Sequence, residues 1–92
     1  MPWNQLVEWE AAHQPGVAEV RHVSVVQQRQ GSFVSIRLAV FYGWPVHHVL
    51  TAVRQEVRTA LESMMAITVL EVSVVASGLV LTPTSPHPPA GT

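Results

Sequence analysis

The most regular pattern of apolar positions along the chain lies between Val46 and Met64. Apolar residues recur there at intervals of three and four, at Val46, Val49, Leu50, Val53, Val57, Ala60, Leu61 and Met64. This spacing places them on one face of an α-helix. Pro45 precedes the run and suits the first turn of a helix, where its missing amide hydrogen would have no helical acceptor. The sequence therefore predicts a long amphipathic helix over about residues 45–65.

Patterns with a period of two predict three strands. The clearest is in residues 32–42, where one face is apolar at Val34, Ile36, Leu38 and Val40. Ser35 and Arg37 fall on the other face of this strand. A looser alternation in residues 17–28 and a turn around Gly31 predict its hairpin partner. After the long helix, an apolar set alternates with polar residues and predicts the third strand, with Leu70, Val72, Val74 and Ala76 facing inward.

A shorter helical pattern in residues 4–13 opens the chain, with Asn4 as its cap and residues 14–16 (QPG) as its end. We interpret Trp9 as a core residue of this helix. The element order is therefore α-β-β-α-β, which predicts a two-layer α+β fold. Its three-stranded sheet is covered on one face by the long helix and the short N-terminal helix. Residues 1–81 form a single domain, and the proline-rich residues 82–92 are expected to be a disordered tail.

The second face of this sheet has no helix left to cover it. Phe33, Ala39 and Phe41 share that face with Ser35 and Arg37, and Val75 lies on the same side of the last strand. Trp44, at the corner between strand and helix, is either a lid on the core or an exposed anchor. The candidate interface residues are Phe33, Arg37, Phe41, Trp44 and Val75. They predict a homo-oligomer, formed through this face or through a free edge strand.

Composition narrows the classes of partner. The 92 residues are 48% hydrophobic and 12% charged, and the net charge of −1 disfavours nucleic acid, because phosphate binding needs clusters of basic residues. The absence of cysteine permits a reducing compartment. The longest apolar runs are too short to span a membrane, and the N-terminal residues do not resemble a secretory signal. We therefore expect a protein that does not itself span the membrane.

Candidate chemistry is sparse. His47 and His48 are adjacent, but neighbouring helical residues project about 100° apart, so the pair does not easily share one metal ion. The sequence has no cysteine, no aspartate and no phosphate-binding glycine loop. We expect no enzymatic activity, no cofactor and no metal. The alternative is a KH-like RNA-binding module, which has a related element order but requires a Gly-x-x-Gly loop between two helices.

Four stretches of the sequence, in order, resemble one known family. They are residues 15–20 (PGVAEV), 34–43 (VSIRLAVFYG), 49–64 (VLTAVRQEVRTALESM) and 69–79 (VLEVSVVASGL). Together they resemble the alkaline shock protein family, also called the general stress or envelope stress response family of Gram-positive bacteria. Members often have Thr-Gly where this chain has Met65 and Ala66. Because a left-handed cap at a residue other than glycine costs about 1 kcal/mol, we expect this helix to end in another way.

The resemblance implies a non-enzymatic protein of the cytoplasmic side of the envelope. Some members of the family are held at the membrane by a small membrane-anchored partner, and members are thought to self-associate. The resemblance therefore implies a cytoplasmic scaffold or interaction module, peripheral to the inner face of the cell membrane, that acts in the envelope stress response.

Overall fold

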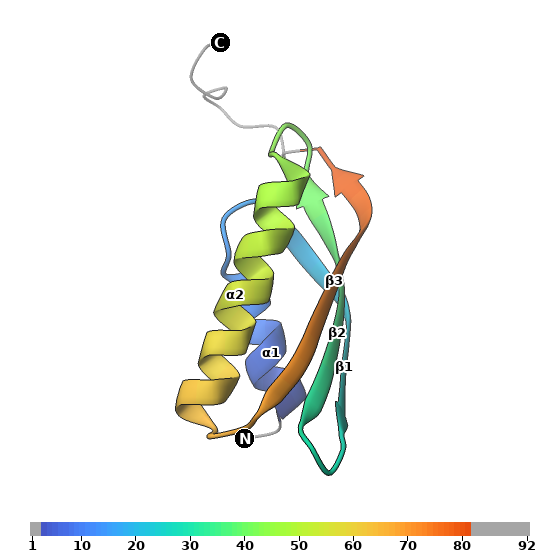
Figure 1. Cartoon of the computed structure of the whole chain (residues 1–92). Coiled ribbons are helices and arrows are strands. Elements are labelled where there is room, and N and C mark those ends of the chain that lie inside the picture. Colours follow the sequence, from blue (N-terminus) through green and yellow to red (C-terminus); the bar gives the residue numbers. More distant parts are fainter. Residues whose placement is uncertain (1–2, 82–92) are drawn as a thin grey trace.

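The computed structural model describes residues 3–81. They form α1 (Trp3–Ala12), β1 (Val17–Gln27), β2 (Ser32–Phe41), α2 (Val46–Met64) and β3 (Val69–Val80), in that order (Figure 1). The predicted α+β class and element order are confirmed, and the ends of the first four elements lie within about two residues of the prediction, whereas β3 extends to Val80, beyond the predicted alternation. The predicted tail at residues 82–92 lies outside the described residues. No helix among residues 3–81 has the length and hydropathy needed to cross a membrane.

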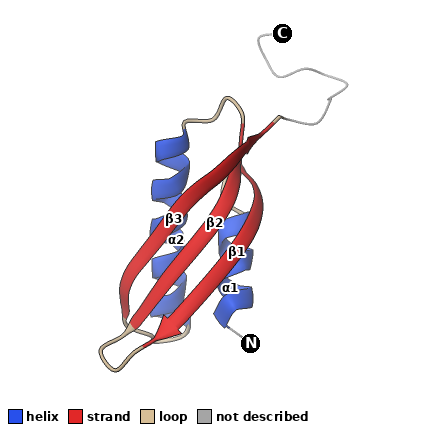
Figure 2. Ribbon diagram, turned by 90° about the vertical axis from the view of Figure 1, so that its right-hand side faces the viewer, coloured by secondary structure: helices blue, strands red, loops and turns tan. Residues whose placement is uncertain are grey.

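The sheet has β2 at its centre. β1 pairs with β2 in the antiparallel sense, and β3 pairs with β2 in the parallel sense. A parallel neighbour requires a crossover connection, which α2 provides. Figure 2 shows both helices behind the sheet, so the structure has two layers and one sheet face without a helix.

The core lies between the helices and the sheet. Its side chains come from the predicted stripe of α2 and the predicted inward face of β2, and the most buried include Val53, Val57, Leu61, Val34, Leu38 and Val40. Each such side chain contributes about 1.5–3 kcal/mol relative to full exposure. α2 runs without a break past Arg54, as the apolar stripe predicts. A KH-like module would need an interruption there, so the helix argues against that alternative.

Three positions predicted to face the core are exposed, and the first is Met64 at the end of α2, which is 66% exposed. Trp9 is 55% exposed and stacks on His13, with ring centroids 4.0 Å apart. In β3, Leu70 is 41% exposed, while Val69 is 4% exposed and faces the core. An irregularity in the pairing with β2, between Ser32 and Phe33, shifts the register there by one residue. Because side chains alternate between the faces of a strand, this shift turns Leu70 away from the core.

The end of α2 also differs from expectation. Ala66 has φ of 53°, so the helix is followed by a left-handed residue although that residue is not glycine. The amide groups of Met65 and Ile67 both donate to the carbonyl of Leu61, at 3.1 and 3.3 Å. The expectation that the missing glycine would give a different ending is therefore wrong. Ala66 adopts the strained conformation itself.

Candidate interaction surface

The sheet face without a helix is the main candidate surface, and we call it the outer face. Pairing between strands assigns its residues: Glu19, His22, Ser24 and Val26 from β1; Phe33, Ser35, Arg37, Ala39 and Phe41 from β2; and Glu71, Ser73, Val75, Gly78 and Val80 from β3. It is the side of the sheet nearest the viewer in Figure 2. Two phenylalanines at its ends and polar residues at its centre make it amphipathic.

The centre of the outer face is built from two rows of paired residues. His22, Arg37 and Val75 lie side by side across the three strands, and Ser24, Ser35 and Ser73 form the next row. Five of these side chains line a shallow hollow of about 330 Å³, namely His22, Ser35, Arg37, Ser73 and Val75. Among residues 3–81, the ion pairs are Arg21–Glu19 and Arg58–Glu62, so Arg37 is not neutralised by a carboxylate within that part of the chain. The centre of the face is therefore polar and positively charged.

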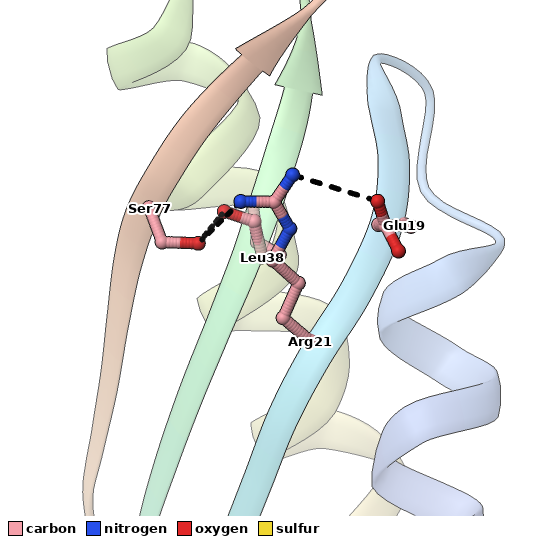
Figure 3. A network of polar contacts seen from close by, with 4 residues as sticks. All are labelled: Glu19, Arg21, Leu38 and Ser77. Carbon is pink, nitrogen blue, oxygen red and sulfur yellow. Dashed lines mark hydrogen bonds and ion pairs between the residues drawn. The ribbon is translucent and has the colours of Figure 1, made fainter.

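Arg21 lies across the outer face from β1 to β3 (Figure 3). One of its nitrogens, Nη1, is 3.5 Å from Ser77 Oγ, and Ser77 Oγ donates to the carbonyl of Leu38 at 3.3 Å. The other nitrogen, Nη2, is 3.5 Å from Glu19 Oε1. An irregularity in the β1–β2 pairing, between Val20 and His22, inserts Arg21 as an extra residue and aims it across the sheet.

The position of Arg21 corrects one expectation about the outer face. Ala39 was expected to contribute exposed apolar surface, but it is fully buried. Its neighbours in the sheet are Glu19 and Gly78, and a Cβ placed on Gly78 would lie 2.9 Å from Arg21 Nη1. The guanidinium therefore covers this row of the sheet. This cover exists because Arg21 is an extra residue in the pairing of β1 with β2. No local sequence pattern predicts that insertion.

The structure brings four of the five predicted interface residues to one face. Phe33, Arg37 and Phe41 lie on the outer side of β2, and Val75 lies beside Arg37 and is 55% exposed. Both phenylalanines are half-buried. They are eight positions apart on one strand, which corresponds to roughly 26 Å. The outer face therefore has two small apolar ends, not one continuous apolar patch.

Trp44 lies apart from the other four. A Cβ placed on Gly16 would be 2.8 Å from the Trp44 ring and 2.8 Å from the Val49 side chain, so the ring contacts the helix layer. The ring is still 46% exposed. Trp44 is thus a lid over the start of β1 whose ring is still partly exposed, and its use as an anchor for a partner stays a prediction.

Sequence reasoning missed part of the exposed apolar surface along β3. Leu70, Leu79 and Leu81 are 41%, 56% and 75% exposed, in addition to Val75. A signal for this strand was present: residues 69–81 contain a single charged residue, Glu71, and no proline. Edge strands commonly carry charges or proline to prevent pairing with other chains. The sequence alone did not show that β3 is an edge strand.

His47 and His48 lie in the first turn of α2, and both are exposed. Their ring centroids are 6.1 Å apart and the rings are tilted by 53°. Within residues 3–81, no group of three or more His, Cys, Asp or Glu side chains is placed to hold a metal ion.

Comparison with protein families decides the wider relationship of this fold. A family model for the alkaline shock protein 23 family, described as having a cell envelope-related function, matches residues 11–81. The chain belongs to this family. The resemblance seen in the sequence is confirmed, and the family is described as having an envelope-related function.

Solved structures with the same fold include C-terminal domains of MamM. One covers 83% of this chain and 94% of the MamM domain, with a TM-score of 0.70 and 19% sequence identity. A zinc form of a MamM variant covers 83% and 81%, with a TM-score of 0.69 and 19% identity. A nickel form of another variant has a TM-score of 0.70 and 19% identity, covering 83% and 94%. At this identity the likeness establishes the fold alone. No curated protein sequence matches the chain.

Proposed function

We propose that this protein is a non-enzymatic, self-associating interaction module that acts in the envelope stress response. It works on the cytoplasmic side of the membrane, where a small membrane-anchored partner holds it. Family membership, with its envelope-related function, supports the location. The observation that carries the proposal is the sheet, which has a helix layer on one face only. Its outer face and its β3 edge leave Val75, Val26 and Leu79 about half exposed. Apolar side chains left exposed on an uncovered sheet face and along an edge strand favour contact with another protein chain.

The side chains of the outer face support a binding role over a catalytic one. The hollow that contains His22, Ser35 and Ser73 is open and shallow, and among the described residues no hydrogen bond joins His22 to a serine. A nucleophilic serine needs a base within hydrogen-bonding distance and a third group that orients the base. The zinc and nickel forms of the MamM domain do not extend to this proposal, which includes no metal and no cofactor.

The partner claim is tested by affinity capture from native membranes. The Arg37→Glu substitution reverses the charge at the centre of the outer face. The Arg29→Glu substitution is the matched control, because it makes the same change in charge in the exposed turn after β1. A small membrane protein is expected to co-purify with the wild-type chain and with Arg29→Glu. The amount recovered with Arg37→Glu is expected to be at least tenfold lower. Equal recovery with both variants, or no membrane protein with the wild-type chain, contradicts the proposal.

The self-association claim is tested separately, by sedimentation over a range of micromolar concentrations. A dimer or larger assembly is expected. A chain that remains monomeric throughout that range rules out self-association and leaves the outer face for a different protein.

A further inference from the structure

The two free edges of the sheet differ in how open they are to another strand. The β1 edge is interrupted by two irregularities, one between Val17 and Glu19 and one between Val20 and His22. Its outward carbonyl at Val23 also accepts a hydrogen bond of 3.4 Å from Asn4 Nδ2 of α1. Irregular pairing and side chains that occupy edge carbonyls both discourage strand addition.

The β3 pairing also has two irregularities, and its regular stretch, residues 71–76, is as long as residues 22–27 of β1. The edges differ because the side-chain hydrogen bond to β1 falls inside its regular stretch, at Val23, whereas the one to β3 falls outside, at Val69.

The amide of Ser32 donates to the carbonyl of Thr68 at 2.9 Å, and the amide of Tyr42 donates to Val80 at 2.7 Å. Even-numbered residues of β2 therefore direct their backbone groups toward β3. In parallel pairing, each even-numbered residue of β2 forms hydrogen bonds with the two β3 residues on either side of its partner. The partner residues themselves therefore point their amides and carbonyls away from β2, toward the open edge. These outward residues are Val72, Val74 and Ala76, which pair with Val34, Ile36 and Leu38.

A side-chain hydrogen bond bounds this open stretch at one end, and an irregularity in the pairing bounds it at the other. Arg58 Nη1 of α2 donates to the carbonyl of Val69 at 3.2 Å, which occupies the edge before the stretch begins. A register shift between Leu38 and Ala39 makes Ser77 an extra residue and ends the regular pairing. The open segment is thus residues 72–76, with Val74 at its centre.

We propose that β3 of one copy pairs with β3 of a second copy, antiparallel and related by a two-fold axis at Val74. This inference rests on the self-association proposed above and names its surface. The two copies of Val74 exchange hydrogen bonds with each other, and Val72 of each copy exchanges them with Ala76 of the other. The two sheets then form one continuous sheet of six strands. The open segment is used completely, and neither the bond from Arg58 nor the irregularity at Ser77 has to change.

Charge and side-chain exposure favour edge-to-edge pairing of β3 with β3 over a contact between two outer faces. Stacking two outer faces about their centres would bring Arg37 near its own copy, and like charges in contact are unfavourable. Pairing at Val74 instead sets Val75 opposite Ser73 of the second copy, which covers part of a side chain that is 55% exposed. Glu71 lies opposite Ser77 of the second copy, away from its own equivalent. Because the β1 edge is obstructed, the assembly closes as a dimer.

Cysteine cross-linking tests the register, since the native chain has no cysteine. In the proposed dimer, Ser73 and Val75 of opposite copies form a non-hydrogen-bonded pair, with Cα atoms about 4.5 Å apart. The Ser73→Cys and Val75→Cys variants are mixed under reducing conditions, allowed to exchange subunits and then oxidised. The mixture is expected to yield a disulfide dimer. Either variant alone should not, because its two cysteines are diagonal neighbours about 7–8 Å apart, beyond the usual range for a disulfide.

Two controls separate the alternatives. A mixture of His22→Cys and Ser24→Cys on β1 should not cross-link, and Phe41→Ser on the outer face should leave the dimer intact in sedimentation. If the wild-type chain is a dimer but the β3 mixture does not cross-link, or if Phe41→Ser produces monomers, this inference is wrong and self-association stands. If the wild-type chain is monomeric, both proposals fail.

Discussion

Trp44 lies directly over Gly16, so closely that a Cβ on Gly16 would be 2.8 Å from the indole ring. Gly16 has φ of +90°, which side-chain-bearing residues rarely adopt. Its carbonyl accepts a hydrogen bond of 2.9 Å from the amide of Phe41, at the start of the β1–β2 pairing. One glycine thus lets the chain turn out of α1, enter the sheet and receive the aromatic lid at the N-terminal end of α2.

Replacing Gly16 with alanine is expected to lower the free energy of unfolding by about 2–4 kcal/mol. About 1 kcal/mol comes from the positive φ, and the remainder from overpacking against Trp44 and Val49. Gly43 is a matched control, because it has φ of +98° with no atom within 4 Å of its added Cβ. Gly43→Ala should cost only about 1 kcal/mol. If urea denaturation gives the same decrease in the free energy of unfolding for both variants, the contact with Trp44 does not contribute to the cost.

Ala66 provides a stabilising test, since its φ is 53° and only glycine adopts that region without strain. Ala66→Gly is expected to raise stability by about 1 kcal/mol, or roughly 4–8 °C in the midpoint of thermal unfolding. Ala52→Gly, in the interior of α2, should lower it by about 0.5–1 kcal/mol. If both variants are destabilised, the left-handed ending of α2 is not present in solution.

The sequence predicted the elements well because each buries one face, and burial on one face leaves a periodic pattern. The stripe on α2 and the alternation in β2 gave bounds within about two residues of those observed. Leu70 was misplaced because a register shift against β2 decides which way it faces. That shift depends on a strand nearly forty residues earlier, and a local pattern cannot report it.

Trp9 was predicted to be a core residue but lies outside the buried face of α1, which is narrow. α1 buries a narrow stripe of Leu6, Val7 and Ala11, and Trp9 lies outside it against His13. Trp9→Ala is therefore expected to lower stability by less than about 1 kcal/mol, whereas Leu6→Ala, which removes a side chain 7% exposed, should cost about 2–5 kcal/mol. A loss for Trp9→Ala as large as that for Leu6→Ala would place Trp9 in the core after all.

The two histidines at the start of α2 are predicted to be replaceable. Because both side chains are exposed and their rings diverge, the His47→Gln/His48→Gln variant should unfold at the same urea concentration as the wild-type chain. After dialysis against buffer without metal, neither protein is expected to retain stoichiometric zinc or nickel by elemental analysis. Retention by the wild-type chain that the double variant lacks would establish a metal site.

Part of the candidate surface followed from the sequence and part did not. Alternation placed Phe33, Arg37, Phe41 and Val75 on the side away from the helices, because it needs only the local period of a strand. The burial of Ala39 and the openness of the β3 edge depend on which strands are neighbours and where a residue is inserted. Those are long-range properties, so the apolar surface along β3 was recognised only in the structure.

The last prediction concerns Arg21, whose side chain covers Ala39 and reaches Ser77 on β3. Its ion pair with Glu19 has exposed partners and should contribute little, about 0–1 kcal/mol, so most of its effect should come from the packing of its side chain over the sheet. Arg21→Ala is therefore expected to lower stability by about 0.5–1.5 kcal/mol, and by nearly the same amount in low salt and in 1 M NaCl, because packing is not screened. Arg29→Ala, in the exposed turn, should change stability by less than about 0.5 kcal/mol. If the loss for Arg21→Ala largely disappears at high salt, the ion pair with Glu19 dominates and the packing of Arg21 over Ala39 contributes little.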